Sequence, residues 1–108
     1  MLNKNKETAN CYGYRLSVKN GDKEVARTFL YVLHNDIRGK EFGYIEDVFV
    51  EEGYRGNGIA TGLVNDCITL CRALGCYKIV LATQYEYLHH MYEKIGFKKS
   101  GTEFKIYL

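Results

Sequence analysis

The sequence contains no proline and no tryptophan, and it lacks features that mark several classes of protein. No apolar run approaches the roughly 18 residues that a membrane-spanning helix needs. The formal net charge is only +2, and basic residues are scattered among acidic ones, so charge gives no reason to expect a nucleic-acid ligand. The polar first residues lack the apolar core of a secretory signal. We therefore expect neither nucleic-acid nor membrane partners.

The chain has four cysteines, but their arrangement favours neither disulfides nor a metal site. Cys67 and Cys71 would lie one helical turn apart, a spacing that fits no common zinc motif, so we expect no metal site. All four cysteines are predicted to be free, buried thiols. Free thiols without a secretory signal point to a reducing compartment, and the expected localisation is cytoplasmic.

What is present fits one small globular domain. The chain has 108 residues, of which 46% are hydrophobic and 26% are charged, so it can bury a single core and is not expected to be disordered. Residues 1–10 are polar and are predicted to form a flexible N-terminus. The single domain would then comprise residues 11–108.

The order of apolar patterns predicts an α/β fold with a mixed sheet. Asn20 and Gly21 form a strong hairpin signal between two strands, and a third strand would complete an antiparallel meander. A strand after the main helix would run parallel to the third. The expected elements are strands over residues 12–19, 24–34, 42–50 and 77–82, helices over residues 58–74 and 85–95, and short pairing strands over residues 97–99 and 103–108.

The most informative motif is the turn that precedes the main helix, Arg55-Gly56-Asn57-Gly58-Ile59-Ala60. Two glycines separated by one residue let backbone N–H groups converge on an anion, and the helix N-terminus carries about +0.5 e. A Walker A loop is excluded because its Gly-Lys-Ser/Thr string is missing. A dinucleotide loop would need a third glycine where Thr61 stands. The pattern therefore predicts a diphosphate-binding turn.

This hexamer resembles the acyl-CoA pyrophosphate loop of the GNAT N-acetyltransferase superfamily. Two further strings support the resemblance in the expected order: Gly75-Cys76-Tyr77-Lys78-Ile79-Val80-Leu81 and Met91-Tyr92-Glu93-Lys94-Ile95-Gly96-Phe97. The likeness covers residues 42–108. Within it, Ile45-Glu46-Asp47-Val48 is similar to a string of the glucosamine-6-phosphate N-acetyltransferases. The resemblance implies a GNAT-like fold, one acetyltransferase domain over residues 11–108, and acetyl-CoA as co-substrate.

The resemblance also implies catalytic roles. It places Tyr92 beside the coenzyme sulfur as the acid for the leaving thiolate; otherwise Tyr92 is a helix tyrosine that fills the core. Glu46 and Asp47 are adjacent in a strand and should point to opposite faces, so only one can face the cleft directly. Glu46 is the first choice for a general base and Asp47 the second. The alternatives are that one is solvated while the other holds a loop, or that water chains deprotonate the amine.

Coenzyme contacts are expected in two neighbouring stretches. The backbone N–H of Val48 or Phe49 would donate to the developing oxyanion. The loop would hold the pyrophosphate. The complete predicted set is Val48, Phe49, Val50, Arg55, Gly56, Asn57, Gly58, Ile59, Ala60 and Thr61.

The sequence departs from its relatives at two places. Relatives usually carry one or two helices between the first two strands, whereas here a hairpin leaves no room for them. The acceptor cleft is then either open, which would suit a protein or peptide amine, or completed by a second subunit of a homodimer. After the fourth strand the hexosamine-phosphate enzymes carry Asp-Cys, where this chain has Ala82-Thr83.

The expected function is acetyl-CoA-dependent transfer of an acetyl group to a primary amine, by direct attack in a ternary complex. The acceptor would be a small-molecule amine or a protein or peptide amine. The main alternative is a non-catalytic acyl-CoA-binding or regulatory module on the same fold. An unrelated nucleotide-binding protein is the third.

Overall fold

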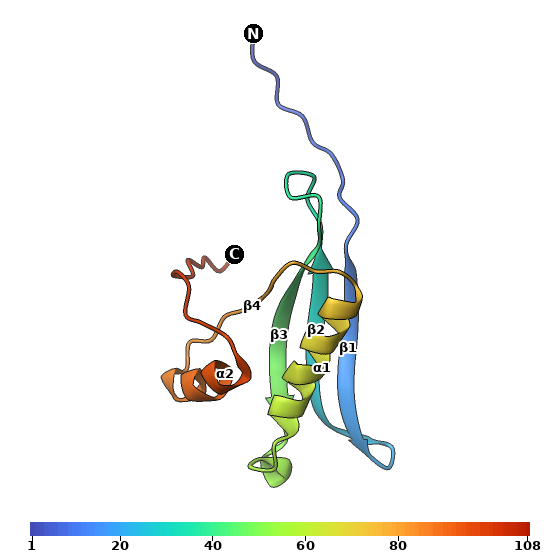
Figure 1. The fold of residues 1–108 in the computed structure, drawn as a ribbon, viewed down its shortest axis with the longest axis vertical. Coiled ribbons are helices and arrows are strands. Elements are labelled where there is room, and N and C mark those ends of the chain that lie inside the picture. Colours follow the sequence, from blue (N-terminus) through green and yellow to red (C-terminus); the bar gives the residue numbers. More distant parts are fainter.

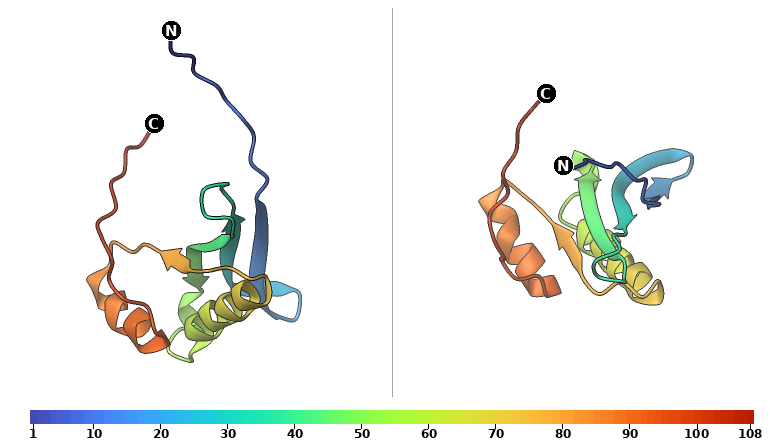
Figure 2. Two further views of the ribbon diagram at one scale, coloured as in Figure 1. Left: turned by 45° about the horizontal axis from the view of Figure 1, so that its top comes forward. Right: turned by 90° about the horizontal axis from the view of Figure 1, so that it is seen from above.

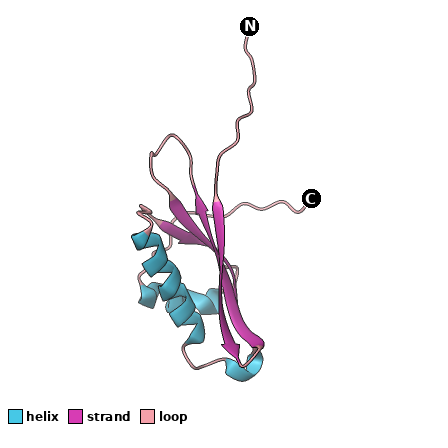
Figure 3. Cartoon of the chain, turned by 90° about the vertical axis from the view of Figure 1, so that its right-hand side faces the viewer, coloured by secondary structure: helices cyan, strands magenta, loops and turns pink.

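A computed structural model describes residues 1–108 and shows a four-stranded sheet with both α-helices on one of its faces (Figures 1 and 3). The strands lie in the order β1-β2-β3-β4; the first three are antiparallel, and β4 is parallel to β3. This confirms the predicted mixed α/β fold. The elements are β1 (Tyr12–Asn20), β2 (Lys23–Leu33), β3 (Phe42–Val50), the 3₁₀ turn η1 (Glu52–Tyr54), α1 (Ile59–Ala73), β4 (Ile79–Leu81), the 3₁₀ turn η2 (Glu86–Leu88) and α2 (His89–Ile95).

The β1–β2 hairpin forms as its sequence predicts. Gly21 adopts a φ of 64°, which the tight turn requires and which few other residues tolerate. Alternate residues of β1 then face α1. Leu16 packs against two clusters of buried side chains, a larger one around Leu30 and Val64 and a smaller one of Ala26, Val50 and Leu63. The two strands are joined directly, with no helix between them.

Helix α1 packs closely against the centre of the sheet. Its buried residues are Leu63, Val64, Cys67 and Cys71. A Cβ atom at Gly43 of β3 would collide with the Sγ atom of Cys71, so glycine allows this close approach. The main core joins α1 and α2 to the sheet; it consists of Leu30, Val32, Ile45, Val64, Cys67, Cys71 and Tyr92.

The predicted C-terminal strands are wrong. The chain forms no helix or strand after α2, and the side chains of Phe104, Ile106 and Tyr107 are 93%, 82% and 86% exposed. Residues 97–99 and 103–108 do not pair with each other. A cavity lies between residues 97–103 and β4, so the segment does not pair with that strand's free edge either. Figure 2 shows the C-terminal residues running away from the sheet.

The cysteines follow the prediction in part. Cys67 and Cys71 are buried, and burial raises the pKa of their thiols to about 11 and about 12. Cys11 is exposed, contrary to expectation, because it precedes β1 next to the N-terminal residues 1–10, which form no helix or strand. No three His, Cys, Asp or Glu side chains gather where they could hold a metal ion. Neither helix is long and apolar enough to cross a membrane.

Candidate active site

Strand β3 bulges near its C-terminal end, at the residues predicted to be catalytic. Arg27 of β2 pairs with Phe49, but Phe29 pairs with Glu46, so one residue of β2 faces two of β3. Asp47, inside this bulge, has a φ of 54° and is the only non-glycine residue with a positive φ. Such a bulge bends a strand and redirects its side chains. No local pattern in the sequence indicates this bulge.

The bulge lies where β3 and β4 separate. Their parallel pairing ends at Ile45 and Leu81. Beyond this point a cavity of about 410 Å³ opens, lined by the end of β3, the residues after β4, and α2. Glu46, Asp47 and Tyr92 all line it, so the structure brings the three predicted catalytic residues together. Val48 is the one predicted coenzyme-binding residue that also lines this cavity.

The structure changes one expectation about the two carboxylates. In a regular strand, adjacent residues point to opposite faces, and only one of Glu46 and Asp47 could face the cleft. Because Asp47 is left-handed, the alternation is broken and both residues line the cavity. A third acidic residue that the sequence did not single out, Glu103, also lines the cavity.

Tyr92 lies on α2 and is 7% exposed. Its ring packs edge-on against Phe97 at a centroid distance of 6.0 Å. Burial raises the pKa of the Tyr92 phenol above its ordinary value, so the hydroxyl keeps its proton at neutral pH. The ring of Tyr92 therefore belongs to the core while the residue also lines the cavity, and its role as the acid for the leaving thiolate stays a prediction.

The loop before α1 has the geometry of an anion-binding turn. Gly56 and Gly58 have φ values of 81° and 77°, and Gly58 is the N-cap of α1 without a side-chain cap. None of the backbone N–H groups over residues 56–61 donates a hydrogen bond within the protein. Unpaired N–H groups at a helix N-terminus are the donors that bind phosphate. These residues fit a diphosphate.

Neighbouring side chains hold this loop in place. The Nε of Arg55 donates to the carbonyl oxygen of Val50 at 2.8 Å, and the amide of Asn57 donates to the carbonyl oxygen of Tyr54 at 3.2 Å. The amide of Asn20, at the β1–β2 turn, donates to the Tyr54 hydroxyl at 2.7 Å. The hairpin thus braces the loop, a contact that sequence reasoning missed because the two segments are distant in the chain.

Phe49 does not line the cavity and lies instead beside Arg55, at the start of the loop. Its ring is 38% exposed and lies 4.8 Å from the Arg27 guanidinium and 6.0 Å from that of Arg55. The predicted coenzyme residues therefore fall into two places: Val48 at the cavity, and the loop with Val50 and Phe49 at the start of α1.

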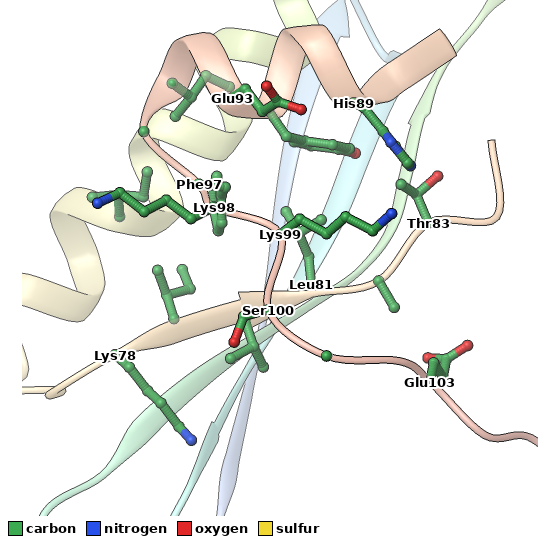
Figure 4. A pocket seen from close by; sticks show the side chains of 18 of the residues that line it. Lys78, Leu81, Thr83, His89, Glu93, Phe97, Lys98, Lys99, Ser100 and Glu103 are labelled. Atoms are coloured by element: carbon green, nitrogen blue, oxygen red, sulfur yellow. The ribbon is translucent and has the colours of Figure 1, made fainter. Parts of the chain in front are cut away.

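A larger cavity, of about 1160 Å³, lies on the other side of β4 (Figure 4). Its walls are β4, α2 and residues 97–103, and Tyr92 is the only predicted catalytic residue among them. Figure 4 shows Lys99 and Glu103 on the C-terminal segment and Lys78 beside β4. The hollow runs along the edge of β4 that has no strand partner.

The family to which this site belongs follows from comparison with known proteins. Residues 4–97 match the acetyltransferase (GNAT) family. The chain belongs to the GNAT acetyltransferase family. The predicted family resemblance is thereby confirmed.

Individual relatives agree with this GNAT assignment. The chain is 37% identical over 68 residues to a glucosamine 6-phosphate N-acetyltransferase of Trypanosoma brucei brucei. The matched stretch is 63% of this chain and 46% of that protein. A second enzyme of that name, from Dictyostelium discoideum, is 33% identical over 88 residues, 81% of this chain and 55% of that protein. The chain thus spans about half the length of the curated relatives it matches.

Solved structures show the same GNAT fold. An acetyltransferase of Trypanosoma brucei superposes with a TM-score of 0.81 at 29% identity, covering 91% of this chain and 69% of that one. Glucosamine-6-phosphate N-acetyltransferase of Arabidopsis thaliana gives a TM-score of 0.74 at 27% identity, covering 79% and 58%.

Proposed function

We propose that this GNAT domain transfers the acetyl group of acetyl-CoA to a primary amine. The observation that carries the proposal is the meeting of Glu46, Asp47 and Tyr92 at one cavity, next along β3 from a loop whose N–H groups are unpaired. Acetyl-CoA would supply the activated acetyl thioester and a diphosphate by which it is held.

Binding would begin at the loop. The free N–H groups over residues 56–61 and the positive end of α1 favour a doubly charged diphosphate. A Cβ atom added at Gly56 or Gly58 would meet no protein atom within 4 Å, so the glycines leave open space above the backbone for a phosphate. Val48 then extends the binding surface from the loop to the cavity.

The carboxylates would prepare the amine. An alkylamine with a pKa near 10.4 is neutral in only roughly one of 10³ molecules at pH 7, so a base that accepts its proton assists attack. Glu46 is exposed and lines the cavity, which suits it to this role directly or through water; Asp47 is the second candidate.

The remaining groups would act on the thioester. The backbone N–H of Val48 or Phe49 would stabilise the negative charge that develops on the carbonyl oxygen. The protonated Tyr92 hydroxyl would donate its proton to the departing thiolate.

The acceptor to test first is glucosamine 6-phosphate, the substrate in the names of the relatives. The open shape of the cavity also suits a peptide amine.

For assembly we propose a homodimer, because Ile106 and Tyr107 are 82% and 86% exposed and the edge of β4 has no strand partner. Sedimentation velocity would test the dimer, and a monomer at all concentrations would contradict it.

The activity test is release of free CoA thiol from acetyl-CoA, measured across hexosamine phosphates, amino acids, polyamines and peptides. Turnover with at least one amine is expected, together with heat of CoA binding in calorimetry. Binding without turnover on any amine would instead favour a non-catalytic acyl-CoA-binding module. No binding at millimolar CoA would end both.

A further inference from the structure

Thr28 is fully buried, with 0% exposure, although its side chain carries a hydroxyl. It lies on β2 between Arg27 and Phe29, the two positions where the pairing with β3 changes register. Thr28 therefore faces the bulge directly. The neighbouring buried positions of the same face, Ala26 and Leu30, are apolar.

The Thr28 hydroxyl makes one contact that explains its burial. Its Oγ1 donates to the backbone carbonyl oxygen of Glu46 at 3.1 Å. A buried hydroxyl is unfavourable unless it is hydrogen-bonded, and a valine would fill the same space without that requirement. Packing alone thus gives no reason for a hydroxyl here.

The accepting carbonyl belongs to the residue that precedes Asp47. Asp47 holds a left-handed conformation that is unfavourable for a residue other than glycine. A bond that fixes the peptide entering Asp47 opposes relaxation of the bulge into regular pairing. That relaxation would move Asp47 and Val48, which both line the cavity.

We propose that Thr28 is a positioning residue for the reaction: its hydrogen bond to Glu46 holds the bulge that directs the carboxylates and the Val48 N–H into the cavity. This inference rests on the proposed function. Thr28 does not line the cavity itself, so it acts through β3.

The test compares Thr28→Val, which keeps the shape and removes the donor, with Thr28→Ser, which keeps the donor. Val32→Ala is the matched control, since Val32 is 1% exposed on the same strand and pairs with Gly43, away from the bulge. For Thr28→Val we expect kcat to fall by about 10- to 100-fold, as for a misplaced oxyanion donor, while KM for acetyl-CoA stays within about twofold. Thr28→Ser should restore kcat, and Val32→Ala should lower stability but keep kcat.

A second readout does not depend on activity. The backbone chemical shifts of Asp47 should indicate a left-handed residue in the wild type and in Thr28→Ser, and a regular strand in Thr28→Val. If Thr28→Val does not fold, Thr28→Cys, with its weaker S–H donor, should give an intermediate kcat. Wild-type kcat in Thr28→Val, or unchanged Asp47 shifts, would overturn the inference. If the wild type releases no thiol but the chemical shifts of Asp47 change between the wild type and Thr28→Val as expected, the proposed function alone would be overturned.

Discussion

A glycine in the left-handed conformation flanks each end of α1, but the backbone groups beside the two glycines differ in their hydrogen bonding. Gly58 before the helix and Gly75 after it adopt nearly equal φ values, 77° and 78°. At the C-terminal end the backbone N–H groups are paired. The N–H of Gly75 donates to the carbonyl oxygen of Arg72 at 3.1 Å, and that of Cys76 donates to the carbonyl oxygen of Cys71 at 2.9 Å. At the N-terminal end no such bonds form. A left-handed glycine thus indicates a binding site only where the adjoining backbone groups are left unpaired.

The largest expected effect is the difference in CoA affinity between two variants that place an aspartate at opposite ends of α1. Gly58→Asp should abolish CoA binding, because a carboxylate beside the loop would clash with and repel a diphosphate. Gly75→Asp is the matched control and should bind CoA like the wild type in calorimetry. Equal affinities for the two variants would show that the loop is an ordinary surface turn.

The next test separates binding at the start of α1 from chemistry in the cleft. Tyr92→Phe should lower kcat by about 10²- to 10⁴-fold, the usual contribution of a general acid, and leave CoA affinity within about twofold. Tyr87→Phe, on a side chain that is 77% exposed, serves as control. Steady-state kinetics of both variants decide the matter, and unchanged turnover in Tyr92→Phe would remove its proposed role.

The two buried cysteines in the middle of α1 should make the free energy of unfolding depend on pH. Burial raises the pKa of Cys67 to about 11 and of Cys71 to about 12, from an ordinary value of 9.0. Between pH 9 and these values the unfolded chain loses protons that the folded chain keeps, so the free energy of unfolding should fall as pH rises. Urea unfolding at several pH values should show a shallower slope for Cys67→Ala and an unchanged one for Cys11→Ser.

The smallest expected effect concerns the C-terminal end alone. Gly75→Ala should reduce the free energy of unfolding by about 1 to 2 kcal/mol, because alanine is strained in the left-handed conformation. Its CoA affinity should equal that of the wild type. Thermal or urea unfolding would measure the stability, and calorimetry would measure the CoA affinity. A loss of CoA affinity would contradict the proposal that only the N-terminal end of α1 binds CoA.

Local signals predicted much of this fold. The hairpin at Asn20 and Gly21, the bounds of β3 and the glycines flanking α1 all depend on residues close together in the sequence. The sequence also predicted that Glu46 and Tyr92 share a site, through a resemblance that the family match confirms.

What the sequence did not predict depends on contacts between distant segments. The bulge at Asp47 lies in the pairing of β3 with β2, where the hydroxyl of Thr28 donates to the carbonyl oxygen of Glu46. The alternation over residues 103–108 favours a strand, but a strand needs an edge within reach, and the course of the chain after α2 prevents that. No pattern within either segment contains this information.

The pairing of β4 has a mechanical consequence. Only three of its residues pair with β3, and its other edge is unpaired, whereas nine residues of β1 pair with β2. Amide hydrogens of β4 should therefore exchange with solvent sooner than those of the hairpin. The seam between β3 and β4, which lies beside both cavities, is therefore expected to be the part of the sheet that opens most readily.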